Sequence, residues 1–233
     1  MTIDLVCLDA DDTLWHNMRY FEAAERALFD LLAPFAAAGV SRAALDAAEA
    51  RNLPLYGYGA KGFTLSMVEA AADLLGPALT AGTVTAILRA GRDLLAHPVE
   101  LLPGVDAALD ALAGRAKLVL ITKGDLLHQE TKLAASGLGS RFAGVEIVSD
   151  KTAATYALVF RTHGVPPERA LMAGDSLRSD VLPALQAGAF AAHVPHGVPW
   201  SHERAEEPDH PRYRRLAALA ELPGWIDAIG RGP

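Results

Sequence analysis

The chain has 233 residues and a net charge of −7, which opposes binding to nucleic-acid phosphates or to anionic lipid surfaces. Its length suffices for one α/β domain with a smaller appended domain. The only cysteine, Cys7, excludes an internal disulfide and favours a reducing, cytoplasmic location. We expect no membrane partner, because the chain lacks a signal-peptide pattern and has no run of about 18 apolar residues.

Short apolar runs that end in polar turn residues recur along the chain, separated by segments with helical spacing. These runs are Ile3–Asp9, Lys117–Thr122, Val145–Ser149, Ala170–Asp175 and Ala189–Val194. Several of them are apolar at successive positions, which favours a parallel sheet covered by helices on both faces. The predicted fold class is α/β with a Rossmann-like core, and ligands are expected at the carboxyl ends of its strands.

The interval 16–97 is rich in Ala and Leu at helical spacing and shows no convincing strand. Its predicted helices are Phe21–Ala37, Arg42–Arg51, Leu65–Leu75 and Thr83–Ala96, with Asn52–Phe63 as a break. We therefore expect residues 1–15 and 98–233 to form the core, with a helical domain inserted at 16–97. In the core, the polar interval 202–215 is interpreted as a surface connection before a final helix near Leu216–Ile229.

Acidic residues follow the first predicted strand, in the sequence Asp9-Ala10-Asp11-Asp12-Thr13. Converging carboxylates raise one another's pKa unless a cation or hydrogen bonds compensate. Such hard oxygen ligands suit Mg²⁺. The alternative interpretation is a solvated acidic turn.

A second acidic group follows another apolar strand, in Gly174-Asp175-Ser176-Leu177-Arg178-Ser179-Asp180. Two strand ends would then offer carboxylates to one site. Asp175 would complete the protein ligands of the metal, and Asp180 would reach it through water or support the loop. For Asp180, the simpler alternative is an acidic residue in the first turn of a helix.

Two further segments offer phosphate-binding groups. Thr122 and Lys123 end a predicted strand, where a hydroxyl and the following backbone N–H groups can hold phosphate oxygens, although a threonine there is often only a helix cap. Lys151 would neutralise a phosphate beside Asp9, although a lone lysine is usually exposed.

Taken together, these residues resemble the haloacid dehalogenase superfamily, whose four motifs they match in type and order: Asp9 with Asp11, Thr122, Lys151, and Asp175 with Asp180. The resemblance covers roughly residues 3–14 and 98–200. It implies a Rossmann-like core, a Mg²⁺ cofactor and an aspartyl-phosphate intermediate.

The resemblance also implies roles for single residues. Asp9 would be the nucleophile and a metal ligand, and Asp175 a further metal ligand. Asp11 would be the general acid and base and would offer its backbone carbonyl to Mg²⁺. Thr122 and Lys151 would bind the phosphoryl group, and Thr13 would help to position the loop that carries Asp11.

Asp11 favours the phosphatase branch, because the haloacid enzymes lack an acidic residue two positions after the nucleophile and need no metal. The predicted function is a Mg²⁺-dependent phosphohydrolase acting on a small phosphomonoester. A phosphomutase stays open, although Thr13 stands where such enzymes typically carry Val. A family member that binds phosphate without turnover is a further alternative.

The inserted helices resemble the first type of cap in this superfamily, which implies a small phosphorylated metabolite as substrate and no nucleic-acid polymer. Tyr58 and Lys61, in a glycine-rich stretch, are candidates for substrate specificity or parts of an ordinary connecting loop. The protein would be a monomer or a homodimer.

Trp15 and His16 are interpreted as packing residues. We interpret four histidines as surface residues, because their spacing fits no zinc pattern: His193, His196, His202 and His210.

Overall fold

The computed structural model describes residues 1–198 and 200–231, which form two compact units. The first, here called the core unit, comprises Met1–His16, Val99–Lys123 and Gln129–Pro233. The second, here called the helical unit, comprises Asn17–Pro98 and Gly124–His128. In the described ranges, no helix combines the length and the apolar character that a membrane crossing requires.

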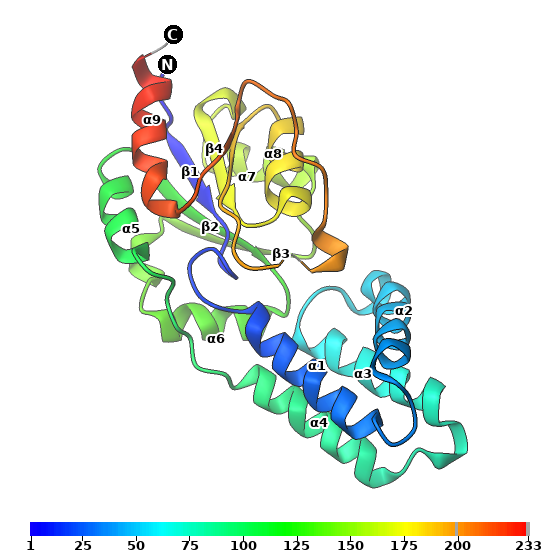
Figure 1. The fold of residues 1–233 in the computed structure, drawn as a ribbon. Helices are drawn as coiled ribbons and strands as arrows, with labels where there is room; N and C mark the ends of the chain where they lie inside the picture. Colours follow the sequence, from blue (N-terminus) through cyan, green and yellow to red (C-terminus); the bar gives the residue numbers. More distant parts are fainter. Residues whose placement is uncertain (199, 232–233) are drawn as a thin grey trace. The chain divides into compact units, whose positions relative to one another are not determined.

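The core unit is built on a parallel sheet of six strands in the order β3-β2-β1-β4-β5-β6. Figure 1 labels β1 to β4 of this sheet. The strands are β1 Leu5–Leu8, β2 Lys117–Lys123, β3 Gly144–Val148, β4 Ala170–Gly174, β5 Phe190–His193 and β6 Tyr213–Arg215. This confirms the predicted Rossmann-like α/β fold class. The strand order reverses between β1 and β4, and the crevice at such a switch point is where open parallel sheets bind ligands.

Helices lie on both faces of this sheet. They are α5 Val105–Ala113, α6 Leu126–Ser136, α7 Ala153–Thr162, α8 Leu182–Gln186 and α9 Leu222–Arg231. Side chains of β1 alternate between two apolar clusters, with Val6 and Leu8 in the cluster of α5 and α9 and Leu5 and Cys7 in the cluster of α7. Because both faces of β1 are buried, its sequence is continuously apolar and its first polar side chain stands at the strand end.

One strand lies where the sequence predicted only a connection. Residues Tyr213–Arg215 form β6, and the final helix begins at Leu222 rather than near Leu216. The sequence did not indicate β6, because a short edge strand with two arginines has neither the apolar alternation nor the length that would distinguish it from a loop.

The helical unit contains the four predicted helices with other bounds: α1 Met18–Leu32, α2 Ala38–Tyr56, α3 Ala60–Leu75 and α4 Ala81–Leu95. The predicted break Asn52–Phe63 is shorter in the structure, because α2 continues past Pro54 and α3 begins before Phe63. Only residues 57–59 separate the two helices, and Gly57 and Gly59 have φ values of 73° and 122° that favour glycine. The unit has its own apolar core, in which Leu28, Leu45, Met67 and Ile87 are buried.

Candidate active site

Three carboxylates converge at the carboxyl ends of β1 and β4. Asp9 follows β1 and its N–H donates to the carbonyl of Ala173 at 3.0 Å, so it extends the pairing of the two strands. Asp175 follows β4, and Asp180 lies in a π-helical turn, Leu177–Val181. Side-chain oxygens of Asp9, Asp175 and Asp180 all lie within 4.8 Å of one another. We refer to these three residues as the oxygen cluster.

Lys151 is a buried part of this site rather than an exposed lysine, with 4% of its surface accessible. Its ammonium donates to Asp180 Oδ1 at 2.7 Å and also to Asp9 Oδ1. The residue stands between β3 and α7, where a capping box formed by Thr152 and Thr155 fixes the start of the helix. The structure therefore holds the lysine charge directly against the oxygen cluster.

The oxygen cluster carries more negative charge than Lys151 balances. Burial raises the pKa of Asp9 to about 7, although Lys151 acts to lower it. Burial and the neighbouring carboxylates raise the pKa of Asp175 well above its usual range. With all three acids ionised, one ammonium leaves two surplus negative charges, and a set of carboxylate oxygens of this kind suits Mg²⁺. The residues present fit the predicted cation.

Gly174 allows the carboxylates to approach so closely. A Cβ atom at this position would stand 2.2 Å from Asp180 Oδ2 and 2.9 Å from Asp9 Cβ. Both contacts are shorter than van der Waals distance, so any larger residue must displace the oxygen cluster.

Gly174→Ala is therefore expected to destabilise the fold by roughly 1–3 kcal/mol, as overpacking does, and to weaken Mg²⁺ binding. Chemical denaturation and Mg²⁺ titration measure the two effects. Gly114→Ala is the matched control, because a Cβ at Gly114 would meet nothing within 4 Å and its φ is −84°. Equal stability and metal affinity of the two variants would contradict the close approach.

Asp11 lies outside the oxygen cluster, with its carboxylate bound by three nitrogen donors. Trp15 Nε1 donates at 2.7 Å, Gln129 Nε2 at 2.9 Å and Lys132 Nζ at 2.5 Å. Burial acts to raise the pKa of Asp11, but the charge and hydrogen bond of Lys132 and the other two donors hold it below its usual range. The predicted metal contact of Asp11 concerns its backbone carbonyl and stays a prediction.

The side chains of Thr122 and Lys123 belong to separate hydrogen-bond networks. The Thr122 hydroxyl is buried and accepts from Gln129 Nε2 at 2.9 Å, so one amide connects Thr122 with Asp11. Lys123 Nζ donates to Ser179 Oγ at 2.7 Å and pairs with Glu203. The charge of Lys123 is thus balanced within the protein, and its role in phosphate binding stays a prediction.

Thr13 connects the two central strand ends. Its hydroxyl donates to Asp9 Oδ2 at 3.3 Å and accepts from the N–H of Asp175 at 3.1 Å. These contacts fit a residue that positions the loop after β1.

The two specificity candidates, Tyr58 and Lys61, belong to the helical unit. There the backbone N–H of Lys61 donates to Asp125 Oδ2 at 3.0 Å, and its ammonium lies 3.6 Å from Asp125 Oδ1. Substrate contact by Tyr58 or Lys61 stays a prediction.

Several residues of the site were not predicted from the sequence. Gln129 and Lys132 lie on α6, three residues apart, and both are buried. Their spacing places them on one helix face, but polar pairs at that spacing are ordinary on solvated helices, so the signal was weak. No sequence pattern indicated a role for Glu203 either, because it pairs with a lysine that is distant in the chain.

The surface interpretation was wrong for His193. This residue ends β5 with 7% of its surface exposed, and its Nε2 donates to the carbonyl of Asp175 at 2.9 Å. Burial lowers the pKa of His193, which favours a neutral ring beside the oxygen cluster.

Comparison with known proteins agrees with this geometry. The family model of haloacid dehalogenase-like hydrolases matches residues 3–188. A haloacid dehalogenase-like family hydrolase from Xanthomonas campestris is 39% identical, with a TM-score of 0.90 over 100% of this chain and 95% of the other. None of the curated protein sequences matches the chain significantly.

Two more distant structures share the fold. A HAD-hydrolase of Bacillus subtilis bound to magnesium, YfnB, has a TM-score of 0.70 at 18% identity, covering 97% of this chain and 100% of its own. The L-2-haloacid dehalogenase of Xanthobacter autotrophicus, with chloropropionic acid covalently bound, has a TM-score of 0.61 at 20% identity, covering 99% of each chain. The long family match and the Xanthomonas relative establish that this chain belongs to the haloacid dehalogenase-like hydrolases.

Proposed function

We propose that this chain is a Mg²⁺-dependent phosphatase that acts on a small phosphorylated metabolite and forms an aspartyl-phosphate on Asp9. The observation that carries the proposal is that the carboxylates of Asp9 and Asp11 lie in different surroundings. The oxygen cluster around Asp9 has the negative charge and the oxygen ligands that a hard cation needs. The carboxylate of Asp11 is instead bound by N–H groups of Gln129 and Lys132. Magnesium in the Bacillus subtilis neighbour supports the choice of ion.

Each residue would act on a defined bond or proton. Bound Mg²⁺ would supply positive charge to the phosphoryl oxygens. An Asp9 oxygen forms the new bond to phosphorus while the bond to the leaving oxygen breaks, and Lys151 balances the negative charge that gathers there. The nitrogen donors favour the ionised form of Asp11, so it would first take up a proton and would then donate that proton to the leaving oxygen. Asp11 then accepts a proton from the water that hydrolyses the aspartyl-phosphate.

Lys132 is a positioning residue for Asp11 in this scheme. Lys132→Met removes the positive charge that favours the ionised carboxylate, so the pKa of Asp11 should rise. The limb of the pH–rate profile that reports Asp11 is expected to move to higher pH. Lys132→Arg keeps the charge and should leave that limb in place. A profile of kcat/KM that is unchanged in Lys132→Met would contradict the role.

Mg²⁺ affinity should rise with pH. Protons compete with the metal for Asp9, whose pKa burial raises to about 7, so ionised Asp9 is scarce at pH 6 and prevails at pH 8. Isothermal titration is expected to show about tenfold tighter binding at pH 8, since one proton must leave over this range. Equal affinity at the two pH values would contradict the account in which a metal ligand titrates near pH 7.

The proposed activity is tested with p-nitrophenyl phosphate in the presence of Mg²⁺ or EDTA, and in parallel with L-2-chloropropionate. We expect phosphate release that depends on Mg²⁺ and no chloride release. Chloride release without metal would instead assign the chain to dehalogenation. Absence of turnover on phosphomonoesters with any divalent metal would favour a binding role.

A further inference from the structure

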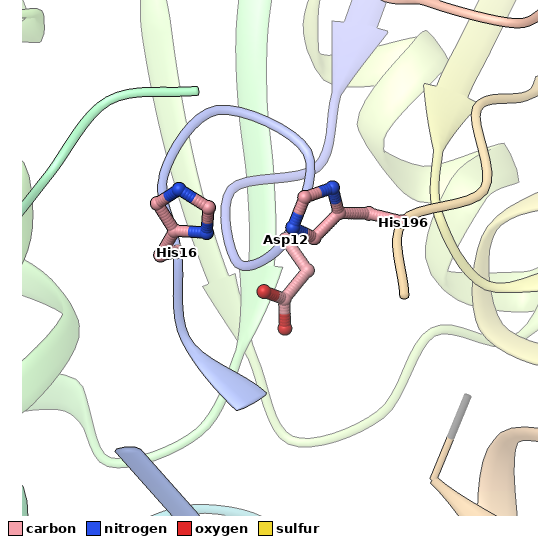
Figure 2. Close-up of side chains that lie close together, drawn as sticks. All are labelled: Asp12, His16 and His196. Atoms are coloured by element: carbon pink, nitrogen blue, oxygen red, sulfur yellow. The ribbon is translucent and has the colours of Figure 1, made fainter. Parts of the chain in front are cut away.

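A second group of metal-ligating side chains lies in the core unit and shares no residue with the oxygen cluster. It consists of Asp12, His16 and His196, which each offer one ligand atom within 4.8 Å of the others. Figure 2 shows the three side chains facing a common space. Asp12 and His16 come from the loop after β1, and His196 comes from the segment after β5. The two imidazole ring centroids are 5.2 Å apart.

The backbone fixes the loop that carries Asp12 and His16. The N–H of Asp12 donates to the carbonyl of Trp15 at 2.8 Å, and the N–H of His16 donates to the carbonyl of Glu100 at 3.0 Å. Trp15, between these residues in the loop, is fully buried. The loop is thus held in place by its own hydrogen bonds and by the packing of an indole.

Asp12 adopts an uncommon backbone conformation to point into this space. Its φ is 56°, the one positive value of a non-glycine residue in the part of the chain described by the structure. Aspartate tolerates this left-handed region better than most residues, but at some cost in energy. Strained backbone that the surroundings maintain is often found where a side chain serves a function.

Backbone hydrogen bonds join the segment that carries His196 to the neighbouring strands. The N–H of Val194 donates to the carbonyl of Gly174 at 2.8 Å, and the N–H of Leu216 donates to the carbonyl of His193 at 2.9 Å. These bonds continue the sheet just before His196 and fix the start of this segment at the carboxyl end of β5, two strands from β1.

The donor set differs in chemistry from the oxygen cluster. Two imidazole nitrogens with one carboxylate suit borderline divalent ions such as Zn²⁺, Co²⁺, Ni²⁺ or Fe²⁺, whereas Mg²⁺ prefers oxygen ligands. Three protein ligands would leave a coordination position for water. We propose that Asp12, His16 and His196 form a second metal site that takes Zn²⁺ and joins the loop after β1 to the segment after β5.

The test is a Zn²⁺ titration of the full chain without a histidine tag, in saturating Mg²⁺, against a chromophoric chelator. We expect one Zn²⁺ per wild-type chain. His16→Ala and His196→Ala should each weaken Zn²⁺ binding by more than about a hundredfold, since even the loss of a supporting partner costs about 10–100-fold. His210→Ala, at an exposed position, is the matched control and should bind like the wild type. Co²⁺ titration should add visible absorption that both site variants lose.

Asp175→Asn separates this inference from the proposed function, because it removes a ligand of the oxygen cluster only. It should retain Zn²⁺ binding while its Mg²⁺ affinity falls, and neither readout requires turnover. The inference is overturned if wild type binds no Zn²⁺, if both histidine variants bind it normally, or if Asp175→Asn abolishes binding. Should His16→Ala fail to fold, His196→Ala in the segment after β5 decides the question alone.

Discussion

Asp9→Asn should abolish turnover of phosphomonoesters while leaving the protein folded. An amide oxygen cannot form the aspartyl-phosphate, so we expect the rate on p-nitrophenyl phosphate to fall by at least about 10⁴-fold. The fold should tolerate the change, because Lys151 keeps a carbonyl oxygen as acceptor and the crowded oxygen cluster loses one negative charge. Initial rates and thermal unfolding without metal measure the two outcomes.

The matched control is Asp110→Asn, which removes a carboxylate with 65% of its side chain exposed, remote in sequence from the strand ends. It should retain wild-type turnover. If Asp9→Asn kept more than a few per cent of the wild-type rate after purification from a host lacking the wild-type chain, Asp9 would not be the nucleophile.

Lys151→Met is expected to have the largest effect on stability. The buried ammonium is bonded to two buried carboxylates, Asp9 and Asp180, and its removal leaves both without their cation. Breaking a buried pair in this way typically costs about 3–5 kcal/mol. Urea denaturation in EDTA should show a loss of this size, and Mg²⁺ should restore part of it by supplying positive charge to the same oxygens.

The sign of its pH dependence follows from the raised carboxylate pKa. Removing Lys151 raises the pKa of Asp9 further, and protonated Asp9 needs no counter-charge, so the destabilisation by Lys151→Met should shrink as the pH falls towards about 7 and stay level below it. Lys117→Met, at the exposed start of β2, is the control and should change stability by less than about 0.5 kcal/mol. Equal stability of the two variants at pH 8 would show that Lys151 is not paired in solution.

The sheet could be predicted because its central strands are buried on both faces. Continuous apolar runs such as those of β1 and β4 have few alternative interpretations, and each ends at a polar residue. Edge elements follow other rules. β6 is short and charged, and α2 continues through Pro54 where local sequence indicated a break.

The oxygen cluster could be predicted for a related reason. Parallel strands end at one edge of the sheet, so Asp9 and Asp175 could be placed at that edge once β1 and β4 were recognised as strands, and the resemblance to the family motifs assigned them to one site. Gln129 and Lys132 could not be assigned in this way, because the helix face that contacts Asp11 depends on how α6 packs. The approach of His196 to His16 depends on the course of the segment after β5, which spacing along the chain does not encode.

The most direct test of the central claim is a crystal structure of the protein grown in Mg²⁺. We predict one ion that contacts carboxylate oxygens of both Asp9 and Asp175 at about 2.1 Å, the usual Mg²⁺–oxygen distance. A structure in which Mg²⁺ is bound elsewhere, with these two side chains directed into separate regions of solvent, would contradict the account.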